Sequence, residues 1–507
     1  MMKIYITILS IAVLSLTGCK KFLEIQPKDL KIAKTVDDYQ ELLNGEGWGK
    51  SMGSGSDAEL YWLEMLTDDV GEYLATSSSP SDSKIQYSQF YTWSNDPDLT
   101  YINKAVSAYN IGTWTWLYRV VNISNMVISE IDNMTTQNEN SRALLKSEAL
   151  FSRALAFFYI LNIWGEPYKP TATALGVPLK TTPFPSLLGT PRSTVQEGYD
   201  LIINDLLEAE TTITASGVVP TGSVFHVSKE AIEILLSRAY LYTQNWQKAK
   251  EYADKAIATG PALFDLNSET FSTSAATNFF NPRNTEILFT YHRNAKSTTG
   301  STYIFGQSVT ASIYVVSNDM INVFAKDLVT SAVDIRKNAF VQVLIGRNFS
   351  KTPLQEGSAF LTPTTKLYDY DIRIGEAYIN RAEASAQLNN LAEAVADLNT
   401  LRAKRISGSS AVTYSNQAAL LNFIYEERRR ELFFQGHRWF DLRRTTQPAI
   451  THVYTPVVGT GTTATIGTPL TFVLSQNDAG YTIEIPVKER EYNTSVTPLG
   501  LPERVPQ

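Results

Sequence analysis

Apolar side chains recur every three or four residues over long stretches of this chain, which is the spacing of helices with one buried face. The pattern predicts helices over the segments 36–43, 114–132, 141–164, 194–212, 229–243, 246–259, 372–388, 391–404 and 417–435. Strand-like runs are scarcer, and the clearest, Glu286–Tyr291 and Tyr481–Val487, are expected at the periphery. Gly45–Ser56 and Val457–Pro469 are rich in turn residues and predict exposed loops. A mainly α fold is therefore expected.

An internal repeat indicates that these helices pair into hairpins. Three predicted helices share an Arg-Ala pair with a Glu upstream: Arg153 with Glu148, Arg238 with Glu233, and Arg381 with Glu376. Two of the three are followed by a short turn and an Ala-rich second helix, which is typical of tetratricopeptide-type pairs. The copies lie much farther apart than the ~34 residues of a contiguous array. Long insertions are therefore expected between the units, and the three arginines predict a shared packing role.

The first 18 residues read as a targeting segment, with a Lys near the start and an apolar run over Ile4–Leu16. Leu16-Thr17-Gly18-Cys19 matches the bacterial lipobox, in which cleavage before the Cys frees it for lipid attachment. Cys19 is the only cysteine of the chain. The sequence thus predicts a lipoprotein signal peptide over 1–18 and a lipidated Cys19 with a tether over 19–35. Acyl chains would hold the protein to a membrane.

Composition narrows the function classes. The 507 residues carry a net charge of −7 and are 43% apolar, which is typical of a folded globular protein. A pI near 5.4 argues against a nucleic-acid binder. The lone cysteine excludes an internal disulfide, and no HExxH motif or nucleophile elbow is present. No cofactor and no metal site are predicted; acidic clusters leave a bound Ca²⁺ open, although no EF-hand-like loop supports it.

The densest motif is Ile424–Arg444, which reads IYEERRRELFFQGHRWFDLRR. This stretch resembles the C-terminal signature of the SusD/RagB family. Cys19–Pro27 resembles the start of these proteins, and Trp114–Tyr118 is similar to their Trp-x-x-x-Tyr helix. Glu148–Phe158 and Ile483–Pro486 also resemble family segments, in the same order along the chain. The resemblance therefore extends over almost the whole sequence.

The resemblance implies one mainly α-helical ectodomain over 36–507 with about four tetratricopeptide-like units. The helical scaffold would cover about 114–260 and 370–440, and ligand-facing irregular regions about 45–113 and 265–365. It implies a protein without catalytic activity, anchored in the outer membrane and facing the cell exterior. Such a lipoprotein captures a nutrient, often an oligosaccharide, and delivers it to a SusC-type TonB-dependent transporter.

Ligand contacts are expected from the two irregular regions. Sugar rings have apolar C–H faces and a rim of hydroxyls, so a sugar site needs flat aromatic rings beside polar side chains. The candidates are Trp48, Tyr61, Trp62, Asp68, Asp69, Trp93, Trp116, Tyr303, Phe305 and Tyr314. A peptide ligand with the same transporter is the alternative. A secreted glycoside hydrolase, which would need two carboxylates across a cleft, and a purely structural adaptor are further readings.

The charged residues of the C-terminal motif are interpreted as structural. Glu427 and Glu431 lie one helical turn apart, as do Glu426 and Arg430. Because guanidinium groups pair well with carboxylates, the motif predicts an ion network. The residues assigned to this structural signature are Glu427, Arg428, Arg429, Arg430, Glu431, His437, Arg438, Trp439, Asp441 and Arg443.

Overall fold

The computed structural model describes most of the chain from residue 33 onward. The described residues are 33–48, 60–74, 84–85, 87–97, 112–170, 173–184, 189–219, 224–269, 284–294, 313–340, 343–344, 347–348, 367–408, 411–458 and 465–507. The predicted signal peptide, 1–18, lies outside the described residues. The predicted tether, 19–35, also lies outside them, including Cys19, except for residues 33–35. Tyr303 and Phe305 lie outside them as well.

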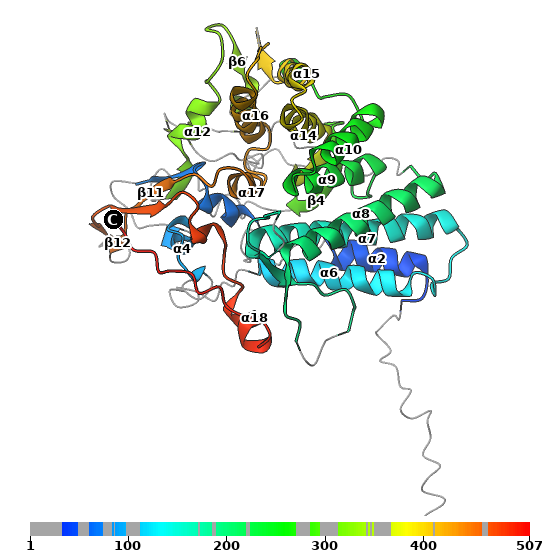
Figure 1. The fold of residues 1–507 in the computed structure, drawn as a ribbon. Coiled ribbons are helices and arrows are strands. Elements are labelled where there is room, and N and C mark those ends of the chain that lie inside the picture. The colour runs from blue at the N-terminus through cyan, green and yellow to red at the C-terminus, as the bar shows by residue number, and fades with distance from the viewer. Residues whose placement is uncertain are drawn as a thin grey trace, which may run out of the picture.

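Helices dominate the described residues (Figure 1). The α-helices are α2 (Val36–Glu46), α4 (Ser88–Tyr91), α6 (Thr113–Glu130), α7 (Glu139–Trp164), α8 (Val195–Ser216), α9 (Lys229–Tyr242), α10 (Trp246–Thr259), α12 (Asn318–Val323), α13 (Ile335–Phe340), α14 (Ile374–Gln387), α15 (Leu391–Arg402), α16 (Gln417–Glu431), α17 (Arg438–Arg444) and α18 (Val487–Tyr492). The mainly α prediction is confirmed, and the long helices begin and end within a few residues of the predicted bounds.

The strands are short and pair two by two, all antiparallel, in the part of the chain that is described. The pairs are β1 (Val70–Tyr73) with β5 (Ile313–Val316), β2 (Leu175–Pro178) with β3 (Arg192–Thr194), β4 (Ile287–Asn294) with β9 (Leu367–Arg373), β6 (Val333–Asp334) with β10 (Ile406–Ser407), β7 (Val343–Leu344) with β8 (Arg347–Asn348), β11 (Ile450–Tyr454) with β14 (Leu470–Leu474), and β12 (Val457–Val458) with β13 (Thr465–Ile466). The described strands form no continuous sheet. Contrary to expectation, β4 is not peripheral: Phe289 and Tyr291 of β4 and Tyr370 and Ile372 of β9 are buried in the main core.

Two further local predictions were wrong. Tyr481–Val487 is not a strand: Asp478 accepts a hydrogen bond from the backbone N–H of Gly480 and starts a 3₁₀ turn over Ala479–Tyr481. Residues 482–485 that follow are all buried, yet no strand among the described residues pairs with them, and Pro486 is the N-cap residue of α18. Val457–Pro469 is also more ordered than a loop, because β12 and β13 pair within it.

Successive helices pack side by side in chain order. In Figure 1, α2, α6, α7 and α8 form one layer, and α9, α10, α14, α15 and α16 stack above it. Side-chain caps fix several helix starts: Thr194 and Glu197 form a capping box at α8, and Ser228 accepts a hydrogen bond from Ala231 N at α9. Small residues allow the close approach of these helices, as the repeat predicts.

The three repeat arginines each tie one helix to another. Arg153 of α7 forms a two-point ion pair with Asp205 of α8, at 2.8 and 2.7 Å. Arg238 of α9 pairs in the same way with Glu376 of α14, at 2.6 and 2.6 Å. Arg381 of α14 pairs with Asp397 of α15. A fork-to-fork geometry fixes both the distance and the rotation between two helices.

A buried ion network surrounds the end of α16. Glu427 accepts from Arg336 at 2.6 Å, from Arg402 at 2.8 Å and from Arg430 at 2.9 Å. Its pKa is held far below the ordinary range: burial opposes ionisation, but the three guanidinium groups outweigh it.

The second carboxylate of this network belongs to Glu431. It accepts from Arg405 at 3.0 Å and from Arg336 at 3.2 Å, and Arg405 also reaches Glu286 at 2.7 Å. A Cβ at Gly375 would lie 2.8 Å from Glu431 Oε1, so a glycine is needed for α14 to pass this close to the carboxylate. Charged groups from four separate segments, namely α16, α13, the end of α15 and the residues before β4, thus meet at one buried point.

The rest of the signature extends this network toward the N-terminal part of the chain. Arg428 pairs with Asp441 at 2.9 Å, and Arg429 with Asp69 at 2.6 Å. Arg443 has no carboxylate partner among the described residues and donates instead to the backbone carbonyls of Asn162, Gly165 and Tyr481. The remaining members pack or pair locally: Trp439 stacks on Tyr481, Arg438 pairs with Asp68, and His437 is buried.

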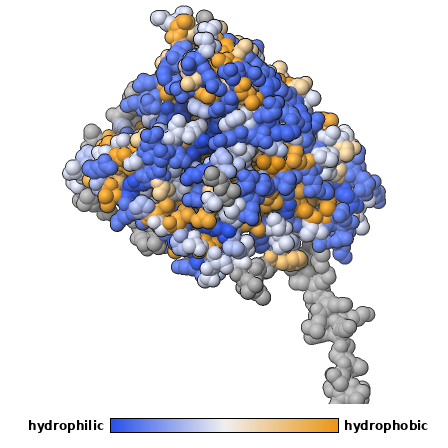
Figure 2. Space-filling view, viewed as in Figure 1, coloured by the Kyte–Doolittle hydropathy of each residue, from blue (hydrophilic) through white to orange (hydrophobic). Residues whose placement is uncertain are grey.

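The surface carries both polar and apolar residues. Figure 2 shows hydrophilic side chains interspersed with small apolar groups over the viewed face. Among the described helices, none combines the length and the apolar character that a membrane crossing requires.

Replacing Glu427 with Gln is expected to lower the free energy of unfolding by about 3–5 kcal/mol, because three buried guanidinium groups would lose one anionic partner. The matched control is Glu426→Gln on the same helix. Its carboxylate is 30% exposed, pairs with the exposed Lys326 and makes only a long contact of 3.9 Å with Arg430, so about 0–1 kcal/mol is expected. Urea unfolding of both variants measures the difference. Equal midpoints for the two would contradict the structural importance of the network.

Candidate functional site

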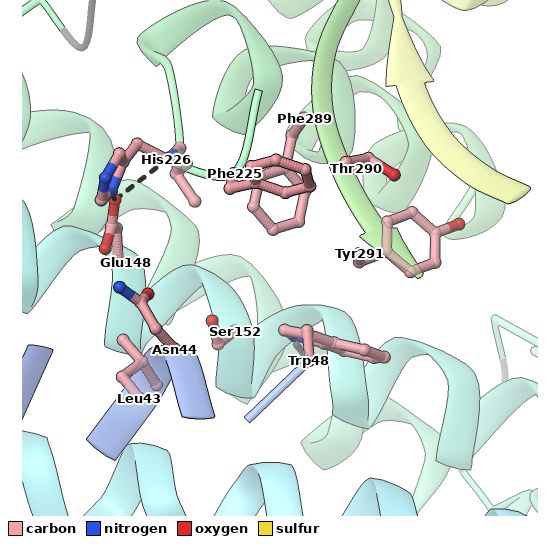
Figure 3. A pocket seen from close by; sticks show the side chains of 11 residues that line it. Leu43, Asn44, Trp48, Glu148, Ser152, Phe225, His226, Phe289, Thr290 and Tyr291 are labelled. Atoms are coloured by element: carbon pink, nitrogen blue, oxygen red, sulfur yellow. Dashed lines mark hydrogen bonds and ion pairs between the residues drawn. The ribbon is translucent and has the colours of Figure 1, made fainter. Parts of the chain in front are cut away.

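A cavity of about 240 Å³ lies between the end of α2, the middle of α7, the segment before α9, and β4. Figure 3 shows its side chains converging from these four elements. Its lining residues are Leu43, Asn44, Trp48, Glu148, Ser152, Phe225, His226, Val227, Phe289, Thr290 and Tyr291. The lining therefore combines four aromatic rings with a carboxylate, an imidazole, an amide and two hydroxyls.

The aromatic wall is held by ring contacts within the core. Trp48 meets Trp116 edge-on at 5.1 Å between ring centroids and Tyr291 at 5.4 Å. Phe289 stacks on Tyr291 with an angle of 15° between the rings. The hydroxyl of Tyr291 hydrogen-bonds that of Tyr159, and burial raises its pKa well above the ordinary value. The wall is consequently rigid before any ligand arrives.

The polar side of the cavity is organised around Glu148. Its Oε1 accepts from the backbone N–H of Val227 at 3.3 Å and lies 2.7 Å from Nδ1 of His226. Its Oε2 accepts from Nε2 of Gln40 on α2 at 2.7 Å. One carboxylate thus joins α2, α7 and the segment before α9. The hydrogen bond with Glu148 raises the pKa of His226, and partial burial of the ring opposes that shift.

Local sequence explains this placement. Glu148 and Ser152 are four residues apart on α7, so both project to the same side of the helix. Ser228 caps α9, which fixes the direction of the preceding residues His226 and Val227. Trp48 follows Gly47, whose N–H bonds back to the carbonyl of Leu43 at the end of α2.

Four predicted ligand-binding aromatics are core residues instead. Trp62, Trp93, Trp116 and Tyr314 are 1%, 3%, 1% and 0% exposed. In three of them the polar side-chain atom already has a hydrogen-bond partner inside the protein: Trp62 donates to Thr113, Trp93 to the carbonyl of Leu66, and Tyr314 to the carbonyl of Lys84. Their faces are packed against other core side chains, so the expectation of exposed stacking rings does not hold for these four.

The two predicted acidic residues, Asp68 and Asp69, form ion pairs with arginines of the C-terminal motif. Asp69 is fully buried against Arg429, and Asp68 pairs with Arg438 through two hydrogen bonds of 2.8 and 2.7 Å. These guanidinium groups hold the pKa of Asp68 far below its ordinary value, although burial opposes them. Among the described side chains, Trp48 is the one predicted ligand-binding residue that lines the cavity. Tyr61 lies on a described 3₁₀ turn, but its side chain is outside the described set.

Sequence reasoning missed most of the cavity. Glu148 appears in the repeat as a packing residue, and nothing in the local pattern marks Phe225, His226 or Tyr291 as neighbours of Trp48. Within the described residues, no cluster of three or more His, Cys, Asp or Glu side chains is arranged to hold a metal ion.

Comparisons with known proteins agree on one family. A family model described as "Starch-binding associating with outer membrane" matches residues 21–241, and the SusD family model matches residues 329–497. SusD-like protein P2 of Formosa agariphila is 24% identical over 496 residues, which cover 87% of this chain and 91% of that protein. SusD-like protein P38 of the same organism is 21% identical over 500 residues, covering 87% and 90%.

Solved structures share the fold. A putative sugar binding protein from Bacteroides vulgatus aligns with a TM-score of 0.68 at 20% identity, covering 94% of this chain and all of that one. A SusD superfamily protein from Bacteroides thetaiotaomicron aligns with a TM-score of 0.67 at 21% identity, covering 92% and 99%. With both family models matching in order along the sequence, the chain belongs to the SusD/RagB family.

His226 is expected to titrate above its ordinary value near 6.5, and Glu148→Gln is expected to lower that pKa because the anionic partner is lost. Since the folded-state pKa is raised, this contact stabilises the protein below about pH 6.5 and the contribution fades as the pH rises through the raised value. NMR titration of the imidazole signals measures both proteins. An unchanged pKa in the variant would contradict the contact.

Proposed function

We propose that this protein is a surface lipoprotein that captures an oligosaccharide and delivers it to a SusC-type TonB-dependent transporter. The observation that carries the proposal is the cavity of Figure 3, in which aromatic rings and hydrogen-bonding groups line one space in a member of the SusD/RagB family. This combination suits a sugar, which has apolar faces and a polar rim. Similarity to a putative sugar binding protein supports the same ligand class.

The proposed ligand contacts also include residues from the two irregular regions of the sequence. Trp48 and β4 are the points at which the described chain enters residues 49–59 and 295–312. The second of these segments contains Tyr303 and Phe305, which remain proposed ligand contacts together with Tyr61. A site of this kind would hold a longer sugar across the surface with one end in the cavity.

We propose binding without hydrolysis. Glycoside hydrolysis needs a pair of carboxylates on opposite sides of the scissile bond. Among the described lining residues Glu148 is the one acid, and both of its oxygens already accept hydrogen bonds from the protein. The cavity is thus equipped to hold a ligand rather than to transfer protons to it.

The soluble mature protein, from Lys20 onward, is expected to bind one class of polysaccharide in calorimetry and affinity gels and to return it uncut. Ser152→Leu narrows the cavity and should weaken that binding about tenfold or more, whereas a surface change such as Lys337→Gln should leave it unchanged. Binding of peptides in place of every glycan would favour the peptide reading. Release of shorter sugars would contradict the binding-only function.

Anchoring through Cys19 is tested separately. In cells given a labelled fatty acid, the full-length protein is expected to incorporate label and to fractionate with the outer membrane. Cys19→Ser removes the acceptor thiol and should leave the chain unlabelled and outside the membrane fraction. Label retained by the variant would overturn the lipoprotein assignment without bearing on ligand binding.

A further inference from the structure

One wall of the cavity is held in place by a contact that can titrate. Phe225, His226 and Val227 line this wall, just before α9. His226 Nδ1 lies 2.7 Å from Glu148 Oε1 on α7 (Figure 3), and the backbone N–H of Val227 donates to the same oxygen at 3.3 Å. The hydrogen bond with Glu148 raises the pKa of His226, although partial burial of the ring opposes the shift. The wall is therefore held most firmly while the imidazole carries its second proton.

The position of this wall depends on the first turns of α9. Ser228 is the N-cap residue, and its hydroxyl accepts a hydrogen bond from the backbone N–H of Ala231 at 3.2 Å. Such a cap forms only when the following turn is helical, because the N–H groups of that turn must point back toward the cap. A change that loosens the start of α9 therefore also loosens residues 225–227.

The start of α9 contains a fully buried acid. The side chain of Glu233 is 0% exposed, and neither carboxylate oxygen has a hydrogen-bond partner among the described residues. Its ion pair with Lys229, one turn earlier, is 3.4 Å long, and the side chain of Lys229 is 38% exposed. Glu233 is the fifth residue of α9, beyond the first turn in which the helix dipole favours a negative charge. A carboxyl group in this environment is most stable in its neutral form.

The charged groups around Glu233 change this preference little. Burial raises the pKa of Glu233 to about 7; Lys229 opposes the shift, whereas Glu210 of α8 and Glu230 of α9 add to it. Lys255 of α10 pairs with Glu210 at 3.1 Å. The acid therefore becomes charged near neutral pH, inside the protein and beside two further carboxylates.

Both titrations weaken the same part of the protein as the pH rises. The pKa of folded His226 lies above its ordinary value near 6.5, so this contribution is complete below about pH 6.5 and is lost as the pH rises through the raised pKa. The pKa of Glu233 is about 7 in the folded protein against an ordinary 4.5, so its contribution is complete below about pH 4.5 and is lost as the pH approaches and passes 7. Tyr291, which also lines the cavity, stays neutral in this range because burial raises its pKa well above the ordinary value.

We propose that residues 225–233 form a pH-sensitive latch segment, which holds one cavity wall against α7 in mildly acidic solution and loosens as the pH rises through neutrality. The inference goes beyond glycan capture, and it rests on the proposed function only for its consequence. A loosened wall lowers the fraction of molecules in which the cavity is formed, and the apparent affinity falls by the same factor. Ligand capture is therefore favoured at acidic pH and release at alkaline pH.

Hydrogen exchange of the mature protein tests the latch segment without any ligand. Exchange is followed by mass spectrometry at pH 6 and pH 8 and corrected for the intrinsic pH dependence of amide exchange. Peptides covering residues 225–233 are expected to lose about tenfold or more in protection at pH 8, since a pKa change of one unit corresponds to a factor of ten. Glu233→Gln keeps the shape of the side chain but cannot ionise, and it should remove most of this loss. His226→Gln removes the other titration and should remove a smaller part.

The matched control is Glu208→Gln on the neighbouring helix α8. It also removes one negative charge, but Glu208 is 52% exposed and pairs with Lys146, so the pH dependence of residues 225–233 should be unchanged. Circular dichroism and thermal unfolding check that each variant folds. Equal protection at pH 6 and pH 8, or an undiminished loss in both Glu233→Gln and His226→Gln, would overturn the latch and leave glycan capture standing. A failure to bind any glycan would leave the exchange result unaffected.

Discussion

The architecture depends on charges that are buried together at the end of α16. Glu427 and Glu431 each accept from more than one guanidinium group, and those arginines come from α13, from α15 and the residues just after it, and from α16 itself. Transferring such charges out of water is costly, so the arrangement is stable only while every member is in place. This all-or-none requirement makes the network a strong constraint on geometry, whatever its net contribution to stability. The helices of the scaffold are fixed relative to one another by these contacts and by the three repeat arginines.

The shape of the cavity depends on how that scaffold positions its walls. Its aromatic wall on β4 is paired with β9, whose end carries Arg373 into the same ion network. Its polar side is built on α7, which Arg153 ties to α8. Trp48 is placed by the end of α2 and by the edge-on contact with Trp116. A small preorganised site is thereby held by elements whose relative positions are set elsewhere, which reduces the ordering cost of binding.

Periodicity and capping signals in the sequence were sufficient for the long helices, because their apolar stripes and end residues act locally. Charge pairing along one helix was visible too, yet the main partners of α16 lie far away in sequence: Arg336 and Arg405 could not be assigned from spacing. The site was less predictable. A Trp side chain packs equally well in a protein core and against the face of a sugar ring. Trp62 and Trp48 therefore cannot be told apart in the sequence and differ only in what packs around them. The cavity itself is formed by four distant segments, and no local pattern encodes their meeting.

The distance along the chain between Asp69 and Arg429 has a consequence for how the molecule is made. These partners are separated by 360 positions, and Arg443 reaches back to carbonyls at the end of α7. The chain is synthesised from its N-terminus, so the buried carboxylate of Asp69 and the carbonyls at the end of α7 await groups that are synthesised last. Closing such loops costs conformational entropy and slows folding. Both contacts therefore form only after the C-terminal part of the chain has been made.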